Sequence, residues 1–185
     1  MAPTCAYNVT LVIVISLQTP PKHQHSVSLT QARVPWECRF QVVGPLSTMD
    51  PSAVLGLFTW EDGASYADYR EIDFEFARWG QASDVNLGQH VIQPYNAVGG
   101  GTMDRFPLRG TTFNDPSNPS GDDVVTCVMV WKFGSIQFLT LHGLYTLESL
   151  AHLPSSAVVR EWEFTGAPNK AVPMPGNEQV RSSAV

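Results

Sequence analysis

Apolar side chains occupy every second position in several short stretches of this chain. Between residues 36 and 43, apolar residues alternate with Glu37, Arg39 and Gln41, which predicts a strand with one buried face. Residues 53–60 are apolar along their length, as in a strand covered on both faces. Runs rich in β-branched and aromatic residues predict further strands at 89–95, 124–133, 135–141 and 157–164.

Clusters of Gly, Pro, Asn and Asp separate these runs, including one at 97–104, and no stretch keeps a helical apolar period. Two closely spaced runs predict a hairpin that turns near Gly134. The apolar run at 10–17 is too short to span a membrane, and a strand is favoured there over a signal-peptide core. The last fifteen residues are predicted to be frayed. The sequence therefore predicts an all-β sandwich or jelly roll in one domain.

Composition narrows the function classes. The chain has 185 residues, a hydrophobic content of 43% and a net charge of −6, with 11 scattered Lys and Arg residues. No basic patch for nucleic acid or an anionic membrane is therefore predicted. Cys5, Cys38 and Cys127 lack metal-ligand spacing and allow at most one disulfide. The last two are expected to be buried free thiols, because they lie in apolar runs.

Three acids stand at alternate positions in "EIDFEFARWG", residues 71–80. In a strand, Glu71, Asp73 and Glu75 would share one face with Trp79, while the apolar residues between the acids face the core. At about 6.6 Å spacing, neighbouring charges repel by about 2.5 kcal/mol at an effective dielectric of 20, and by about 0.6 kcal/mol in water. A solvated sheet face is thus one interpretation. A functional site is the other, because acids are poor strand formers.

Paired carboxyls suit glycoside hydrolysis, in which one carboxylate is the nucleophile and a second, protonated carboxyl is the general acid. Repulsion between neighbours raises the pKa of one carboxyl and keeps it protonated. Asp73 could hold the nucleophile by a hydrogen bond. The α-carbons of Glu71 and Glu75 would lie about 13 Å apart, so the side chains must lean together to reach the roughly 5 Å of a retaining enzyme.

The run "EIDFEF" resembles the ExDxE signature of family sixteen glycoside hydrolases, which include lichenases, laminarinases and xyloglucan transglycosylases. "GLFTWED", "RWG", "QHVIQPY" and "WEFTG…PMPG" are similar, in the same order, to a bacterial-type branch of that family. The resemblance covers residues 26–181. It implies a jelly-roll sandwich whose concave face binds sugar, with retaining hydrolysis of a β-linked glucan-type polysaccharide. No cofactor is expected. Relatives carry a calcium ion on the convex face, but nothing here specifies its ligands, and no metal site is predicted.

By position, the resemblance assigns Glu71 as nucleophile, Asp73 as its helper and Glu75 as acid/base. The side chains that it assigns to substrate binding are Trp60, Trp79, Gln93, Trp131 and Trp162. For each tryptophan except Trp79, a core position is the alternative, because buried aromatics dominate cores. His90 is expected to be a packed structural residue.

The two ends depart from the family pattern. Residues 1–25 form a divergent segment before the domain at 26–181, and 182–185 form a frayed tail. "VRSSAV" stands where the family would have an apolar strand, so strands at both ends are expected to be altered or missing. Such losses would leave an exposed edge.

We expect an extracellular or cell-wall-directed glycosidase that acts as a monomer on a polysaccharide, without nucleic-acid or membrane partners. A transglycosylase would use the same residues, with a second sugar in place of water. A carbohydrate-binding jelly roll without turnover is the alternative from another class, and an inactive chain is a third.

Overall fold

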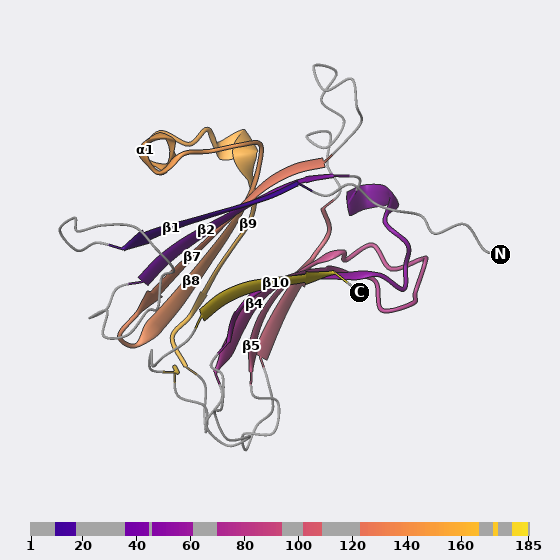
Figure 1. Ribbon diagram of the computed structural model, residues 1–185, viewed down its shortest axis with the longest axis horizontal. Helices are drawn as coiled ribbons and strands as arrows, with labels where there is room; N and C mark the ends of the chain where they lie inside the picture. Colours follow the sequence, from indigo (N-terminus) through magenta and orange to yellow (C-terminus); the bar gives the residue numbers. More distant parts are fainter. Residues whose placement is uncertain are drawn as a thin grey trace.

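The computed structural model of the protein shows two antiparallel β-sheets packed face to face (Figure 1). It describes residues 10–17, 36–44, 46–60, 70–93, 102–108, 123–166, 172–173 and 179–184. The all-β fold and the β-sandwich predicted from the sequence are confirmed. No helix in these ranges is long and apolar enough to cross a membrane.

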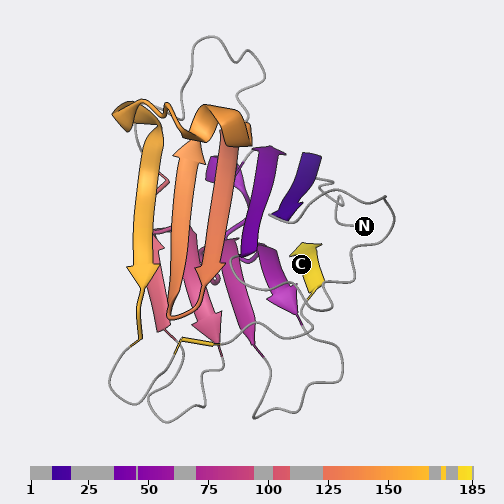
Figure 2. The same cartoon turned by 90° about the vertical axis from the view of Figure 1, so that its left-hand side faces the viewer.

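The first sheet, called sheet I, has the strand order β1-β2-β7-β8-β9. Figure 2 shows this sheet in front, from the orange β9 to the indigo β1. Its strands are β1 (Thr10–Leu17), β2 (Trp36–Gly44), β7 (Asp123–Lys132), β8 (Ser135–His142) and β9 (Val158–Phe164). The expected hairpin joins β7 to β8, and Gly134 occupies the left-handed region at its turn with a φ of 81°.

The second sheet, called sheet II, has the strand order β10-β3-β4-β5-β6. Its strands are β10 (Gln179–Ala184), β3 (Val54–Trp60), β4 (Glu71–Ala77), β5 (Gly88–Gln93) and β6 (Thr102–Phe106). Short helical turns are η1 (Leu46–Thr48), α1 (Leu147–Leu150) and η2 (Ser155–Ala157). The central position of β4 in this sheet gives its outward-facing side chains neighbours on both sides.

Two expectations are corrected by the edge strands, and a third is confirmed. β6 lies partly in the predicted turn cluster at 97–104. β10 pairs with β3 as far as Ala184, where a frayed tail was expected. The strand favoured at 10–17 is present as β1, which pairs with β2. Backbone hydrogen bonds hold an edge strand in the sheet whatever its side-chain pattern, so the polar sequence of residues 179–184 did not predict a strand.

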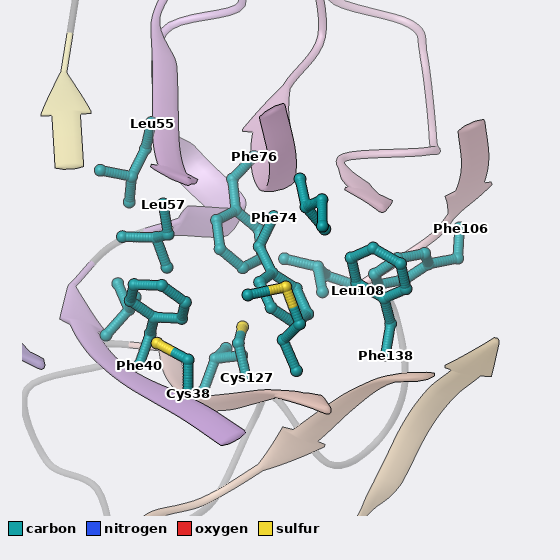
Figure 3. Close-up of a cluster of buried hydrophobic side chains, with 14 of the residues drawn as sticks. Cys38, Phe40, Leu55, Leu57, Phe74, Phe76, Phe106, Leu108, Cys127 and Phe138 are labelled. Carbon is teal, nitrogen blue, oxygen red and sulfur yellow. The ribbon is translucent and has the colours of Figure 1, made fainter. Parts of the chain in front are cut away.

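The core lies between the two sheets (Figure 3). The ring of Phe74 on β4 meets Phe40 and Phe138 from sheet I edge to face, with centroids 5.9 and 5.3 Å apart. Burial of one such ring stabilises the fold by roughly 2–3 kcal/mol. Cys38 and Cys127 are buried free thiols in the same cluster, as expected.

His90 joins the two sheets near the open edge between β6 and β9. It is completely buried, and its Nε2 lies 2.9 Å from the Thr140 hydroxyl on β8. Its Nδ1 lies 3.5 Å from Asp104 on β6, which also accepts two hydrogen bonds from Arg160 on β9 at 2.7 and 2.5 Å. Burial lowers the pKa of His90 to about 3, so the ring is neutral. The expectation of a structural histidine is confirmed.

Candidate functional site

The three acids of β4 lie on the outer face of sheet II, the face turned away from sheet I. Alternation requires this, because Ile72, Phe74 and Phe76 are buried in the core on the opposite face. Asp73 is 1% exposed, whereas Glu71 and Glu75 are half-buried. The predicted shared face is confirmed. A freely solvated row of charges is not, because burial of Asp73 removes its carboxyl from water.

Strand β5 supplies one side of the acidic row. The pairs across β4 and β5 are Glu71 with Gln93, Asp73 with Val91, and Glu75 with Gln89. The Gln93 amide donates to Asp73 Oδ2 at 3.4 Å, so this candidate residue does meet the acids. Val91 and Gln89 are buried, and the middle of the row is therefore a packed layer rather than an open surface.

Strand β3 supplies the other side. Gly56 pairs with Glu75 and presents no side chain beside it, while Phe58 pairs with Asp73. Trp60 lies two residues beyond Phe58, and the alternation with buried Leu57 and Thr59 places it on the same outer face. Phe58 and Trp60 are half-buried. Trp60 is therefore placed toward the Glu71 end of the row.

Burial and mutual repulsion raise the pKa values of the acids in this row. Desolvation, together with the charge of Glu75, raises the pKa of Glu71 to about 7. A hydrogen bond in which Asp73 is the donor acts in the other direction and stabilises the ionised Glu71 carboxylate. Burial also raises the pKa of Glu75.

The buried position of Asp73 favours its neutral form. Its burial, followed by the charges of Glu71 and Glu75, raises its pKa well above the ordinary value, and the amide of Gln93 opposes this only in part. A neutral Asp73 can donate to Glu71 and accept from Gln93. The site thus places a buried acid between two half-buried carboxyl groups, and the pKa of all three is raised, which suits proton transfer near neutral pH.

Trp79 reaches the acidic face by a route that the strand pattern did not predict. Strand β4 ends at Ala77, and Trp79 has a φ of 51°, in the left-handed region. Its indole Nε1 donates to Gln89 Oε1 at 3.2 Å, beside Glu75. The assignment of Trp79 to this face is retained, but a turn places it there and not strand alternation.

Two tryptophans assigned to substrate binding lie elsewhere. Trp131 on β7 is completely buried between the sheets, and its Nε1 donates to the Pro173 carbonyl at 2.8 Å. Trp162 on β9 is half-buried and stacks on Phe138, with centroids 5.2 Å apart. Both belong to sheet I and face the core. The core position, which was the alternative for these two tryptophans, is confirmed. Their assignment as sugar contacts is not supported, because the body of the sandwich separates them from the acids.

Gln89 and Arg105 are site residues that the sequence analysis did not single out. Gln89 shares the outward face of β5 with Gln93, so alternation alone was a usable signal for it. Arg105 on β6 lies opposite Gln89 in the strand register, and its guanidinium forms an ion pair with the Asp84 carboxylate at 2.7 Å. Within the described ranges, no group of His, Cys, Asp or Glu side chains is arranged to hold a metal ion.

Carboxyl groups in this arrangement can attack an acetal carbon and deliver a proton to a leaving oxygen. The chemistry requires one ionised and one protonated group on the same face, and the row contains candidates for both.

Comparison with known proteins assigns no family: the sequence matches no protein-family model, and no curated protein matches it.

Proposed function

We propose that this protein is a retaining glycoside hydrolase that acts on a β-linked glucan-type polysaccharide, on a sandwich of jelly-roll type. The observation that carries the proposal is the burial of Asp73 between the half-buried side chains of Glu71 and Glu75 on one face of β4. A merely solvated sheet face would not bury the middle acid. The proposal extends to a monomer that acts outside the cell or at the cell wall.

In the first step, an oxygen of ionised Glu71 bonds to the anomeric carbon while the bond to the leaving oxygen breaks and Glu75 donates a proton to that oxygen. In the second step, Glu75 takes a proton from water, whose oxygen attacks the same carbon and releases Glu71. The hydrogen bond from Asp73 stabilises the negative charge of Glu71 before attack and after release.

The raised pKa of Glu71 has a consequence for the pH profile. A nucleophile with a pKa of about 7 is largely protonated at pH 6. The kcat/KM value is therefore expected to fall with decreasing pH below about 7. The same raised pKa also suits Glu71 as the acid, so a reversed pair, with Glu75 as nucleophile, is the second assignment to test.

The activity is tested by the release of reducing ends from laminarin, lichenan and xyloglucan. We expect Glu71→Gln to lose activity by roughly 10³-fold or more, because the amide cannot form the glycosyl ester. Glu161→Gln, on the exposed face of β9, is the matched control and should retain activity. Equal release by the native protein and Glu71→Gln would refute the nucleophile. Polymer binding without release by any form would favour a carbohydrate-binding module.

The roles of the two glutamates are separated by the leaving group. A dinitrophenolate needs no proton to depart, so Glu75→Gln should still cleave dinitrophenyl β-glycosides while losing activity on the polysaccharide. Glu71→Gln should lose both activities. The opposite pattern would make Glu75 the nucleophile and Glu71 the acid.

A further inference from the structure

Trp79 combines high exposure with an unusual backbone conformation. Its side chain is 52% exposed. Among the described residues, it is also the one non-glycine residue with a positive φ. Bulky L-residues rarely adopt this region, because the Cβ atom crowds the backbone. A core-filling role does not account for a large side chain that stays half in water at a strained position.

A buried amide fixes the orientation of this indole. Gln89 is 2% exposed, accepts from Trp79 Nε1 at 3.2 Å and donates to the Ala77 carbonyl at 3.5 Å. Gln89 also stands directly opposite Glu75 across β4 and β5. The N–H edge of the indole is therefore held beside Glu75. Strand β4 runs from Glu71 to Ala77, so Trp79, which follows the end of the strand, lies past Glu75 on the side away from Glu71.

The geometry of the proposed reaction assigns a side to each sugar. In a displacement at carbon, the nucleophile, the anomeric carbon and the leaving oxygen lie nearly in line. With Glu71 as nucleophile and Glu75 as proton donor, the leaving oxygen is displaced from the anomeric carbon toward Glu75. The sugar attached to that oxygen therefore extends on the Glu75 side.

We propose that Trp79 is the specificity-determining residue for the leaving sugar, and that Gln89 is its positioning residue. This inference rests on the proposed function. The flat indole suits the C–H face of a pyranose ring, which is the apolar surface of a β-linked glucose unit. The same platform receives the acceptor that competes with water for the glycosyl enzyme. Trp79 would thus govern transfer to a second sugar, and thereby the balance between hydrolysis and transglycosylation.

The test compares substrates that differ only on the leaving side. Laminarihexaose and cellohexaose have sugar leaving groups, whereas the β-fluorides of laminaribiose and cellobiose have only fluoride there. Trp79→Gly removes the ring and suits the positive φ, so it should fold at least as well as the native protein. Trp79→Phe keeps a ring but loses the hydrogen bond to Gln89. Gln89→Met keeps the indole but removes both the acceptor for Trp79 and the hydrogen bond to the Ala77 carbonyl.

For Trp79→Gly, we expect kcat/KM to fall by roughly 10- to 100-fold on the hexaose that the native protein cleaves. The matching fluoride should be turned over unchanged, with transfer from it to added cellobiose or laminaribiose lost. Trp79→Phe and Gln89→Met should also lower kcat/KM on the hexaose and leave turnover of the fluoride unchanged, but the loss should be smaller than for Trp79→Gly.

An equal loss on the hexaose and the fluoride, or no loss on either, would overturn the role of Trp79 while leaving the proposed hydrolase intact. A native protein that cleaves neither class would overturn both proposals. Two alternatives predict an equal loss on the hexaose and the fluoride. In one, Trp79 stacks on the donor sugar; in the other, the roles of the two glutamates are reversed. The same experiment therefore tests both alternatives.

Discussion

Replacement of Glu71 by glutamine should stabilise the folded protein, and only above a certain pH. The folded environment raises the pKa of Glu71 from 4.5 to about 7, chiefly through burial. A raised carboxyl pKa means that the fold favours the neutral form. This contribution to stability is complete below pH 4.5 and is lost as the pH rises to about 7. Glutamine resembles the neutral acid in shape and never ionises.

The size of the effect follows from the shift. Each pKa unit corresponds to about 1.4 kcal/mol, so the full shift would correspond to about 3.4 kcal/mol. Glu71 is only half-buried, and screening by water reduces this value to about 1–2 kcal/mol. We therefore expect Glu71→Gln to match the native free energy of unfolding at pH 4 and to exceed it by about 1–2 kcal/mol at pH 8.

Urea denaturation at the two pH values measures the difference directly, because the free energy of unfolding extrapolates linearly to water. Glu161→Gln on the exposed face of β9 serves as the control, and a surface change of this kind should stay within about 0.5 kcal/mol. A stabilisation of Glu71→Gln that is the same at pH 4 and pH 8 would show that ionisation of Glu71 does not destabilise the fold. So would a native protein that is the more stable form at pH 8.

Three further predictions concern the scaffold. Gly88→Ala should lower the free energy of unfolding, measured in urea, by about 1–3 kcal/mol, because an added Cβ would overlap the Phe106 ring. Adding Phe106→Leu to this variant should recover part of the loss, and strictly additive losses in the double variant would contradict the clash. His90 has a pKa lowered to about 3, so its contribution is complete above about pH 6.5 and is lost as the pH falls toward 3. His90→Gln should flatten the acid-side loss of stability, and an unchanged slope would count against this. Burial raises the pKa of Cys38 to about 12 and that of Cys127 further still. Iodoacetamide followed by peptide mass spectrometry should find both thiols unmodified in the native protein and modified in urea.

Side-chain periodicity predicted the elements that bury one face. In β2, alternation identified Cys38 and Phe40 as core residues, and both are buried. It did not predict the burial of Arg39, whose guanidinium donates to the Tyr145 carbonyl across a long sequence separation. The edge strands β6 and β10 were missed in part or whole for a related reason. Their pairing rests on backbone hydrogen bonds, which leave no mark in the order of polar and apolar residues.

The acidic row was predictable because a strand period of two fixes which side chains share a face. The tryptophans were harder, because an aromatic residue suits either face of a strand. Trp131 lies in a run that is apolar almost throughout, so periodicity could not choose its face. Trp162 alternates with Glu161 and Glu163, so periodicity favoured the core position that the structure shows, although the resemblance assigned it to the substrate. Trp79 was placed on the right face, but its position depends on a left-handed turn and on the amide of Gln89. These follow from tertiary contacts and not from local pattern.

In the proposed reaction, Glu71 forms a covalent bond to the sugar while Glu75 transfers the proton. Donors with fluorine at C2 and a dinitrophenolate leaving group slow the second step and trap the glycosyl enzyme. After incubation with such derivatives of laminaribiose and cellobiose, peptide mass spectrometry locates the added mass. We expect one glycosyl unit on the peptide that contains the β4 acids, attached to Glu71. Attachment to another residue, or an active enzyme that never acquires the label and inverts its product, would contradict the role of Glu71 as nucleophile.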